Sequence, residues 1–127
     1  MAVTVFSPLA QGVLTGKYLD GVPRGSRADS HRLEVLHKGD AVQRLRAFVA
    51  LCDRGGLEPP VAALAWALRL SSVTSAVMGA SSSDQLRQNL AAAELELPSE
   101  LAAGFERIFP LARPGFVRRL VRKLARR

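Results

Sequence analysis

The residues best suited to chemistry lie in the stretch VMGASSSDQLRQN, residues 77–89. An apolar segment leads to Gly79, three serines follow, and a segment with helical character begins. Free backbone N–H groups at a helix N-terminus, together with the positive end of the helix dipole, favour an anion there. Gly79 would let the backbone approach a ligand, and Ser81 could donate to phosphate oxygens. The pattern indicates a phosphate site, although serines in this position also act as helix caps without any ligand.

Amide side chains follow the serines on the first turns of the same predicted helix. Gln85 and Asn89 are four residues apart, so they face the same way, and Gln88 precedes Asn89. Amides at these positions could contact the ribose phosphate and the base of a nucleotide.

A second candidate stretch, SPLAQGVLTGKY, occupies residues 7–18. Ser7 and Pro8 end an apolar segment, as the glycine above ends its own. In a parallel α/β protein both strand ends lie on the same face, where ligands bind. The following loop offers Lys17 and Arg27, two cations that could fold over a pyrophosphate. The alternative is a solvated loop with incidental basic residues.

The elements that must position these residues follow from hydrophobic periodicity and from the placement of Gly and Pro. The predicted order is a buried strand over 2–6, a loop or short frayed helix with turns over 10–28, a helix from an Asp40 N-cap to Gly55-Gly56, a helix over 59–70, a strand over 72–79, a helix over 81–97 and a helix from Pro98-Ser99. Strands alternating with helices predict parallel pairing and an α/β class. Two strands cannot form a stable isolated parallel sheet, so we expect a segment of a larger α/β structure.

The remaining single residues favour structural roles. Trp66 has only apolar neighbours in the sequence, which predicts a core position, and Cys52 is expected to be a small apolar helix residue. His31 and His37 lie in a polar connection, where we expect solvated surface. A single cysteine excludes a disulfide framework or a Cys-based zinc site within one chain. It also favours a reducing compartment, and with no evident targeting segment we predict a cytoplasmic protein.

In combination and order, SPLAQGVLTGKY, GVPRGSR and VMGASSSDQLRQNLAA resemble the C-terminal part of the aldo-keto reductases. The similarity is greatest to the bacterial and potassium-channel-β-subunit branch, and it covers roughly residues 2–97. It implies a (β/α)8 TIM barrel that binds NADPH in extended form and reduces aldehydes and ketones to alcohols. It also implies that residues 2–9 form the seventh barrel strand and 73–79 the eighth, so that the chain is a C-terminal segment of an incomplete barrel.

The resemblance implies a cofactor site made of residues from both candidate stretches. Positions beside the nicotinamide ribose and pyrophosphate, on the closing loop and around the adenosine match, in that order, Ser7, Pro8, Leu9 and Gly12; Lys17 and Arg27; and Gly79, Ser81, Gln85, Gln88 and Asn89. Ser81 and Gln85 would lie near the 2′-phosphate, and Gln88 and Asn89 near adenine. Some branches have arginine at the position of Gln85. A neutral amide neutralises no phosphate charge, so strict NADPH preference does not follow from the resemblance.

The family's catalytic Asp, Tyr, Lys and His lie on earlier strands, and no residue here matches them. Tyr18 and Lys17 belong to the cofactor-loop motif instead. We therefore expect no catalytic residue, no metal site and no carbonyl reduction by this chain alone. The expected partner is the missing N-terminal part of the barrel, and the chain would arise by truncation, a split gene or a late start. The alternative function is a non-enzymatic binding or interaction module.

Charge separates a neutral body from a basic end. Residues 113–127 hold seven cations and no acids, whereas the rest of the chain holds 11 of each. We therefore predict a partial barrel over 1–110 and a basic amphipathic tail over 111–127. Three interpretations of the tail stay open: a helix packed on the barrel, an anchor on an anionic membrane surface, and nucleic-acid binding, which the neutral body disfavours.

Overall fold

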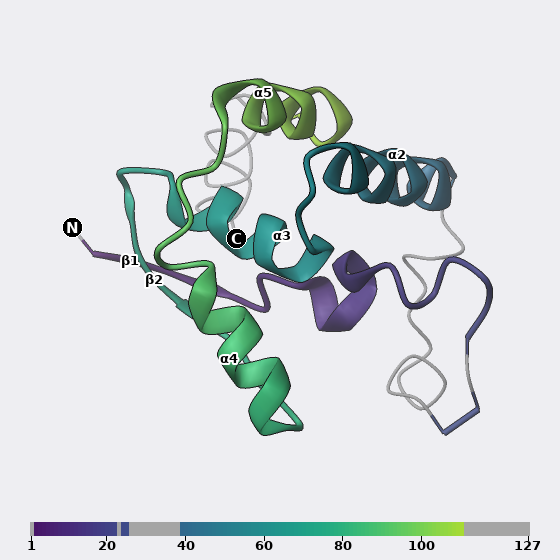
Figure 1. Ribbon diagram of the computed structural model, residues 1–127, viewed down its shortest axis with the longest axis horizontal. Coiled ribbons are helices and arrows are strands. Elements are labelled where there is room, and N and C mark those ends of the chain that lie inside the picture. Colours follow the sequence, from purple (N-terminus) through teal and green to yellow (C-terminus); the bar gives the residue numbers. More distant parts are fainter. Residues whose placement is uncertain (1, 23, 26–38, 111–127) are drawn as a thin grey trace, which may run out of the picture.

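The structure, a computed structural model, describes residues 2–22, 24–25 and 39–110 (Figure 1). Arg27, both histidines and the basic tail over 111–127 lie outside the described residues, so the expectations for them stay predictions.

The elements follow the predicted order. They are strand β1 (Val3–Phe6), 3-10 helix η1 (Ala10–Thr15), helices α2 (Ala41–Arg54) and α3 (Pro59–Leu68), strand β2 (Val73–Val77), and helices α4 (Ser83–Ala91) and α5 (Ser99–Ile108). The helix predicted over 81–97 is shorter, because α4 ends at Ala91 and turns follow it. Within the part of the chain that the structure describes, no helix combines the length and apolar character that a bilayer crossing requires.

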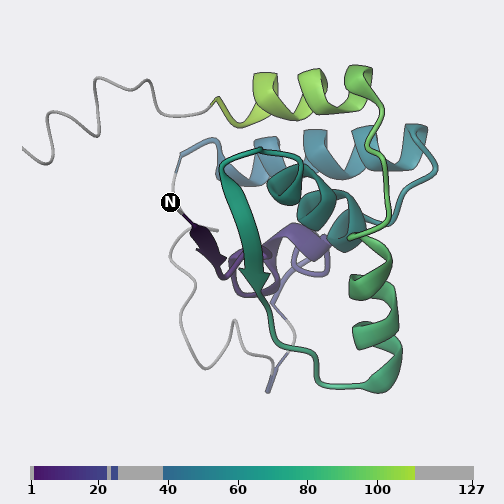
Figure 2. The ribbon, with the colours of Figure 1, turned by 90° about the vertical axis from the view of Figure 1, so that its left-hand side faces the viewer.

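The two strands pair in parallel, as predicted. The register runs from Val3 opposite Val73 to Phe6 opposite Val77, with one irregularity between Val3 and Thr4. Parallel pairing places the carboxyl ends of both strands at the same edge of the sheet. Figure 2 shows the two strands side by side and pointing in the same direction.

The prediction that β1 is a buried strand is wrong for one of its faces. Val3 and Val5 are partly buried, whereas Thr4 is exposed and Phe6 is 81% exposed. Successive strand residues point to opposite faces of a sheet. Helix α3 covers the face that carries Val5, and the described residues leave the face that carries Phe6 open.

An aromatic cluster joins the helices on the covered side. Phe48 of α2 and Phe105 of α5 are 1% and 0% exposed, and their ring centroids lie 4.8 Å apart. Trp66 of α3 meets Phe105 edge-on at 6.2 Å and, partly buried, packs against the core cluster, which agrees with its predicted structural role. Such ring pairs add to the stabilisation that comes from burial alone.

The starts of α2 and α3 and the end of α2 follow the predicted signals. Proline occupies the first turn of α3, and Gly55 and Gly56 follow the last residue of α2. Asp40 is the N-cap residue of α2, as predicted, although its side chain makes no capping hydrogen bond. Its carboxylate accepts a hydrogen bond from Arg44 Nε at 2.8 Å, because an arginine one turn later offers a charged donor.

Replacing Phe105 by alanine tests the aromatic cluster. We expect Phe105→Ala to lower the free energy of unfolding by about 3–5 kcal/mol, because the fully buried ring leaves a cavity. The matched control is Phe6→Ala, which removes an exposed ring and should cost less than about 0.5 kcal/mol. Chemical denaturation followed by circular dichroism measures both, and equal losses would contradict the assignment of the core.

Candidate functional site

Both candidate stretches begin at one edge of the sheet. Because Phe6 and Val77 are register partners, the chain leaves both strands at the same level. From this edge it runs into η1 after β1, and into α4 after β2 (Figure 2). The expectation that the two strand ends share a face is therefore confirmed.

The backbone after β1 has an unusual conformation. Ser7, Ala10 and Gln11 have φ values of 52°, 48° and 58°, and Gly12 follows at 93°. Residues with a Cβ rarely adopt this left-handed region, which costs each of them on the order of 1–2 kcal/mol. Backbone strain of this kind clusters at ligand sites and switches.

Packing and a hydroxyl hold η1 in place. Val13 is buried in the main core cluster, and Gly16 approaches α2 so closely that a Cβ there would lie 3.1 Å from Val49 Cγ2. The Thr15 hydroxyl donates to the Gly12 carbonyl at 2.7 Å and accepts from the Lys17 N–H at 3.5 Å. Thr15 was not among the predicted site residues, although it lies within the LTGKY motif.

Lys17 folds back onto Gly12. A Cβ at Gly12 would lie 3.0 Å from Lys17 Cε and 3.1 Å from Lys17 Nζ, so the missing side chain leaves the space that the lysine fills. The same ammonium lies 5.0 Å from the centroid of the Tyr18 ring. Two predicted site residues are thus brought together. Their neighbour Tyr18 was assigned to the same motif but was not among the predicted site residues.

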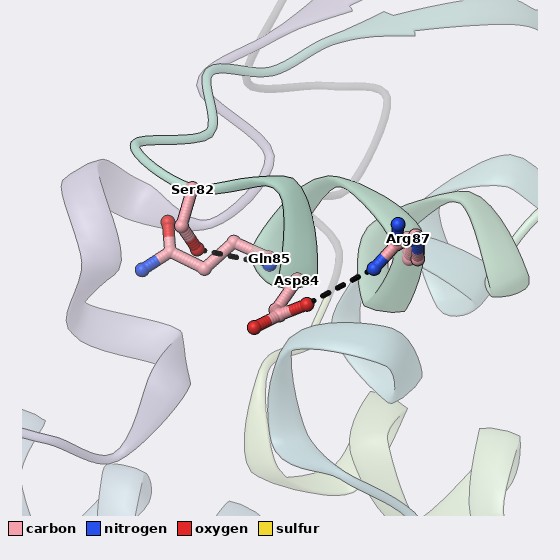
Figure 3. A network of polar contacts seen from close by, with 4 residues as sticks. All are labelled: Ser82, Asp84, Gln85 and Arg87. Atoms are coloured by element: carbon pink, nitrogen blue, oxygen red, sulfur yellow. Dashed lines mark hydrogen bonds and ion pairs between the residues drawn. The ribbon is translucent and has the colours of Figure 1, made fainter.

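The N-terminus of α4 is capped by its own side chains. Ser82 Oγ accepts a hydrogen bond from the Gln85 N–H at 3.2 Å (Figure 3). Gln85 Oε1 in turn accepts from both the N–H and the hydroxyl of Ser81, each at 3.0 Å. This reciprocal pattern is close to a capping box. The cap interpretation is confirmed for Ser82, and Ser81 and Gln85 bind each other.

An ion pair and an open glycine complete the surroundings of this helix start. Asp84 accepts from Arg87 at 3.2 Å on the exposed surface (Figure 3), where such pairs contribute little. A Cβ at Gly79 would have no atom within 4 Å, and Gly79 does not lie in the left-handed region. Neither packing nor conformation therefore demands glycine at this position.

The amides of α4 differ in their burial. Gln85 and Gln88 are exposed, whereas Asn89 is 8% exposed. The helix packs on α3, where Ala92 joins Leu64 in a second apolar cluster. Asn89 is the one buried residue of α4, and Leu90 beside it is 58% exposed, so the helix is largely exposed and contacts the protein near its C-terminal end.

The predicted residues form two groups rather than one. The first group follows β1 and contains Ser7, Pro8, Leu9, Gly12 and Lys17; the second follows β2 and contains Gly79, Ser81, Gln85, Gln88 and Asn89. Among residues 2–22, 24–25 and 39–110, no hydrogen bond or ion pair links the two groups. The two groups are related in space because both follow the same carboxyl edge of the sheet.

Cys52 belongs to neither group, and its thiol is unreactive near neutral pH. Its side chain is 0% exposed, and burial, with a smaller contribution from the Asp53 carboxylate, raises the pKa of its thiol from 9.0 to about 12. The thiolate is the reactive form, so this residue is no nucleophile near neutral pH. Within the described ranges no group of three or more His, Cys, Asp or Glu residues could hold a metal ion.

The buried thiol makes stability dependent on alkaline pH. The pKa of the thiol is higher in the folded state than in the unfolded state. The stability that comes from keeping the thiol protonated is therefore fully present below about pH 9 and is lost as pH rises toward 12. Between about pH 8 and pH 10.5 we expect wild type to lose about 1–2 kcal/mol more unfolding free energy than Cys52→Ala. Denaturant titrations at both pH values measure this, and equal losses would show that the thiol ionises freely in the folded chain.

Comparison with known proteins gives consistent matches. The model of the Aldo/keto reductase family matches residues 1–108. The chain is 35% identical over 97 residues to a putative voltage-gated potassium channel subunit beta of Schizosaccharomyces pombe, covering 72% of this chain and 28% of that protein. It is 36% identical over 105 residues to the protein Tas of Escherichia coli, covering 81% and 30%. It is also 36% identical over 115 residues to the NADH-specific methylglyoxal reductase of Escherichia coli, covering 84% and 35%.

These matches confirm the family resemblance of the motifs, but they cover only part of each relative. The chain spans about a third of the length of these relatives. The family model, however, covers nearly all of the residues that the structure describes, including both strands and both candidate groups. The chain belongs to the aldo/keto reductase family.

Proposed function

We propose that this chain supplies the cofactor-binding part of an oxidoreductase that reduces carbonyl groups with a nicotinamide nucleotide. The observation that carries the proposal is the parallel register of β1 and β2, from whose shared carboxyl edge both candidate groups start. In (β/α)8 barrels ligands bind at this edge. In the proposal, β1 and β2 correspond to the seventh and eighth strands of the barrel.

The residues present fit such a nucleotide. Lys17 offers a positive charge beside Gly12, which suits a pyrophosphate. Gly79 leaves open space before the N-terminus of α4, where backbone N–H groups favour a phosphate. Gln88 and Asn89 would lie toward the adenine, and Ser7, Pro8 and Leu9 toward the nicotinamide ribose, as the family resemblance implies. When bound, the nucleotide supplies the hydride.

The chain's own residues bind and orient in this proposal, and none acts on the carbonyl. No residue matches the family's Asp, Tyr, Lys and His, so a proton donor for the alcohol would come from an N-terminal barrel part. The partners proposed are therefore the nucleotide and that barrel part, and we expect no turnover by this chain alone.

Nucleotide titration tests the proposal directly. Energy transfer from Trp66, the single tryptophan, to reduced nicotinamide reports binding. We expect Lys17→Met to weaken binding of NADPH and NADH by about tenfold, because a charge-assisted contact is lost. The matched control, Arg54→Met at the exposed end of α2, should leave binding unchanged. Absence of binding by wild type, or equal binding by Lys17→Met, would contradict the proposal.

The choice between NADPH and NADH would lie with Ser81 and Gln85. The family resemblance favours NADP(H), yet both Ser81 donors already serve Gln85 Oε1, and one relative is NADH-specific. A 2′-phosphate would have to compete for those donors, whereas NADH presents only a hydroxyl there. Gln85 is therefore the proposed determinant of cofactor preference.

Adding a charge at position 85 should shift that preference. We expect Gln85→Arg to raise the affinity for NADPH relative to NADH by about fivefold, because an exposed guanidinium forms a screened contact with the 2′-phosphate. Ala91→Arg adds the same charge at the exposed far end of α4, outside the proposed nucleotide site, and serves as the control. Competitive titration of the two nucleotides measures the ratio. An unchanged ratio in Gln85→Arg, or equal shifts in both variants, would place the 2′-phosphate elsewhere.

A second candidate function is a non-enzymatic interaction module, which the relative described as a putative channel subunit favours. The behaviour of the chain in solution distinguishes this function from the cofactor-binding one. Cooperative unfolding of a monomer or a symmetric oligomer would support it, whereas aggregation through the open sheet edges would count against it.

A further inference from the structure

The ring of Tyr18 contacts Lys17, and the proposed cofactor site assigns no role to Tyr18. The side chain of Tyr18 is 5% exposed and belongs to the main core cluster. The Lys17 ammonium lies 5.0 Å from the centroid of its ring. We infer that Tyr18 is a positioning residue for Lys17, whose ring holds the ammonium beside Gly12 so that it can meet a phosphate-bearing ligand. The identity of that ligand rests on the proposed function.

A lysine at this position needs such a support. An ammonium on a flexible four-carbon stem samples many rotamers, and each must be given up when an anion binds. The face of an aromatic ring attracts a cation. Because the Tyr18 ring is fixed by burial, it favours one location for an otherwise exposed ammonium.

The backbone of the loop makes this contact possible. Gly12 lacks the Cβ that would lie 3.0 Å from Lys17 Cε. The Thr15 hydroxyl links the Gly12 carbonyl to the Lys17 N–H and so fixes the distance between the two residues. The ammonium of this exposed side chain is thereby kept beside Gly12, in the loop that follows β1.

The ring of Tyr18, and not its hydroxyl, positions the Lys17 ammonium. The Tyr18 hydroxyl is buried and has no hydrogen-bond partner among the described residues. A phenyl ring at this position would keep the cation–π contact, whereas an aliphatic side chain of similar size would fill the space without an aromatic face. Tyr18→Phe and Tyr18→Leu therefore separate positioning from packing.

The position of Lys17 can be tested without any ligand. The sequence has three lysines, so ¹³C-lysine NMR of the whole chain resolves their ε-methylene groups, and Lys17→Arg assigns the signal of Lys17. We expect that signal to be shifted upfield by the Tyr18 ring, to stay shifted in Tyr18→Phe and to move to the position of a free lysine in Tyr18→Leu. If Tyr18→Leu does not fold, Tyr18→Met replaces it. An unshifted Lys17 signal in wild type, or a shift that persists without the ring, would overturn the inference.

Titration with inorganic pyrophosphate tests the consequence for binding. We expect Tyr18→Leu to weaken binding by about twofold to fivefold, the range of an exposed cation–π contact, and Tyr18→Phe to restore it. In a Lys17→Met background, Tyr18→Leu should have no further effect. An equal loss with and without Lys17 would show that Tyr18 acts on packing alone. If wild type binds neither pyrophosphate nor nucleotide while the Lys17 signal still follows the ring, the proposed function fails and the positioning role stands.

Discussion

The rest of the structure depends on the parallel pairing of β1 with β2. Parallel strands cannot be joined by a tight turn, so the chain between them must cross back over the sheet. That crossover contains η1, α2 and α3, and α3 covers one face of the pair. Because the pairing aligns Phe6 with Val77, it also brings together the starts of the two segments that carry the candidate site.

Burial offsets the backbone strain that follows β1. Ser7, Ala10 and Gln11 adopt conformations that disfavour residues with a Cβ. The same loop buries Val13 and Tyr18 in the cluster that contains Phe48. Burying each of these two side chains contributes about 1.5–3 kcal/mol, so together they are comparable to the strain of the three residues, at about 1–2 kcal/mol each. The strained loop can therefore persist at the edge of the sheet, where it places Lys17.

At the start of the helix that follows β2, a cap and the proposed phosphate site would use the same donors. A helix start must satisfy its free N–H groups with side chains, water or a ligand. Here Ser82 serves the N–H of Gln85, and Gln85 serves Ser81. The cap stabilises α4 without a ligand, and any phosphate that used Ser81 would first displace a neutral amide oxygen. Cap strength and phosphate affinity are thus opposed at this helix.

Local patterns in the sequence determined the order of the elements and several of their ends, although not the end of α4. Two prolines start α3, and two glycines follow α2. These residues act through their own φ angles, so their effect on a helix end does not depend on distant segments. The motifs also indicated both candidate groups and the family. The sequence also placed Asp40 at the N-cap of α2, but its carboxylate binds Arg44 instead of a backbone N–H.

Only the tertiary structure decided which faces and side chains are covered. Phe6 belongs to an apolar run, yet it is 81% exposed because the described helices pack on the other face of the sheet. Gln85 and Asn89 share a helix face, but only Asn89 is buried, since α4 meets α3 near its C-terminal end. The contact of Lys17 with Tyr18 likewise depends on a ring that the core holds in place. Periodicity tells which residues share a face, whereas burial depends on what a distant part of the chain places against that face.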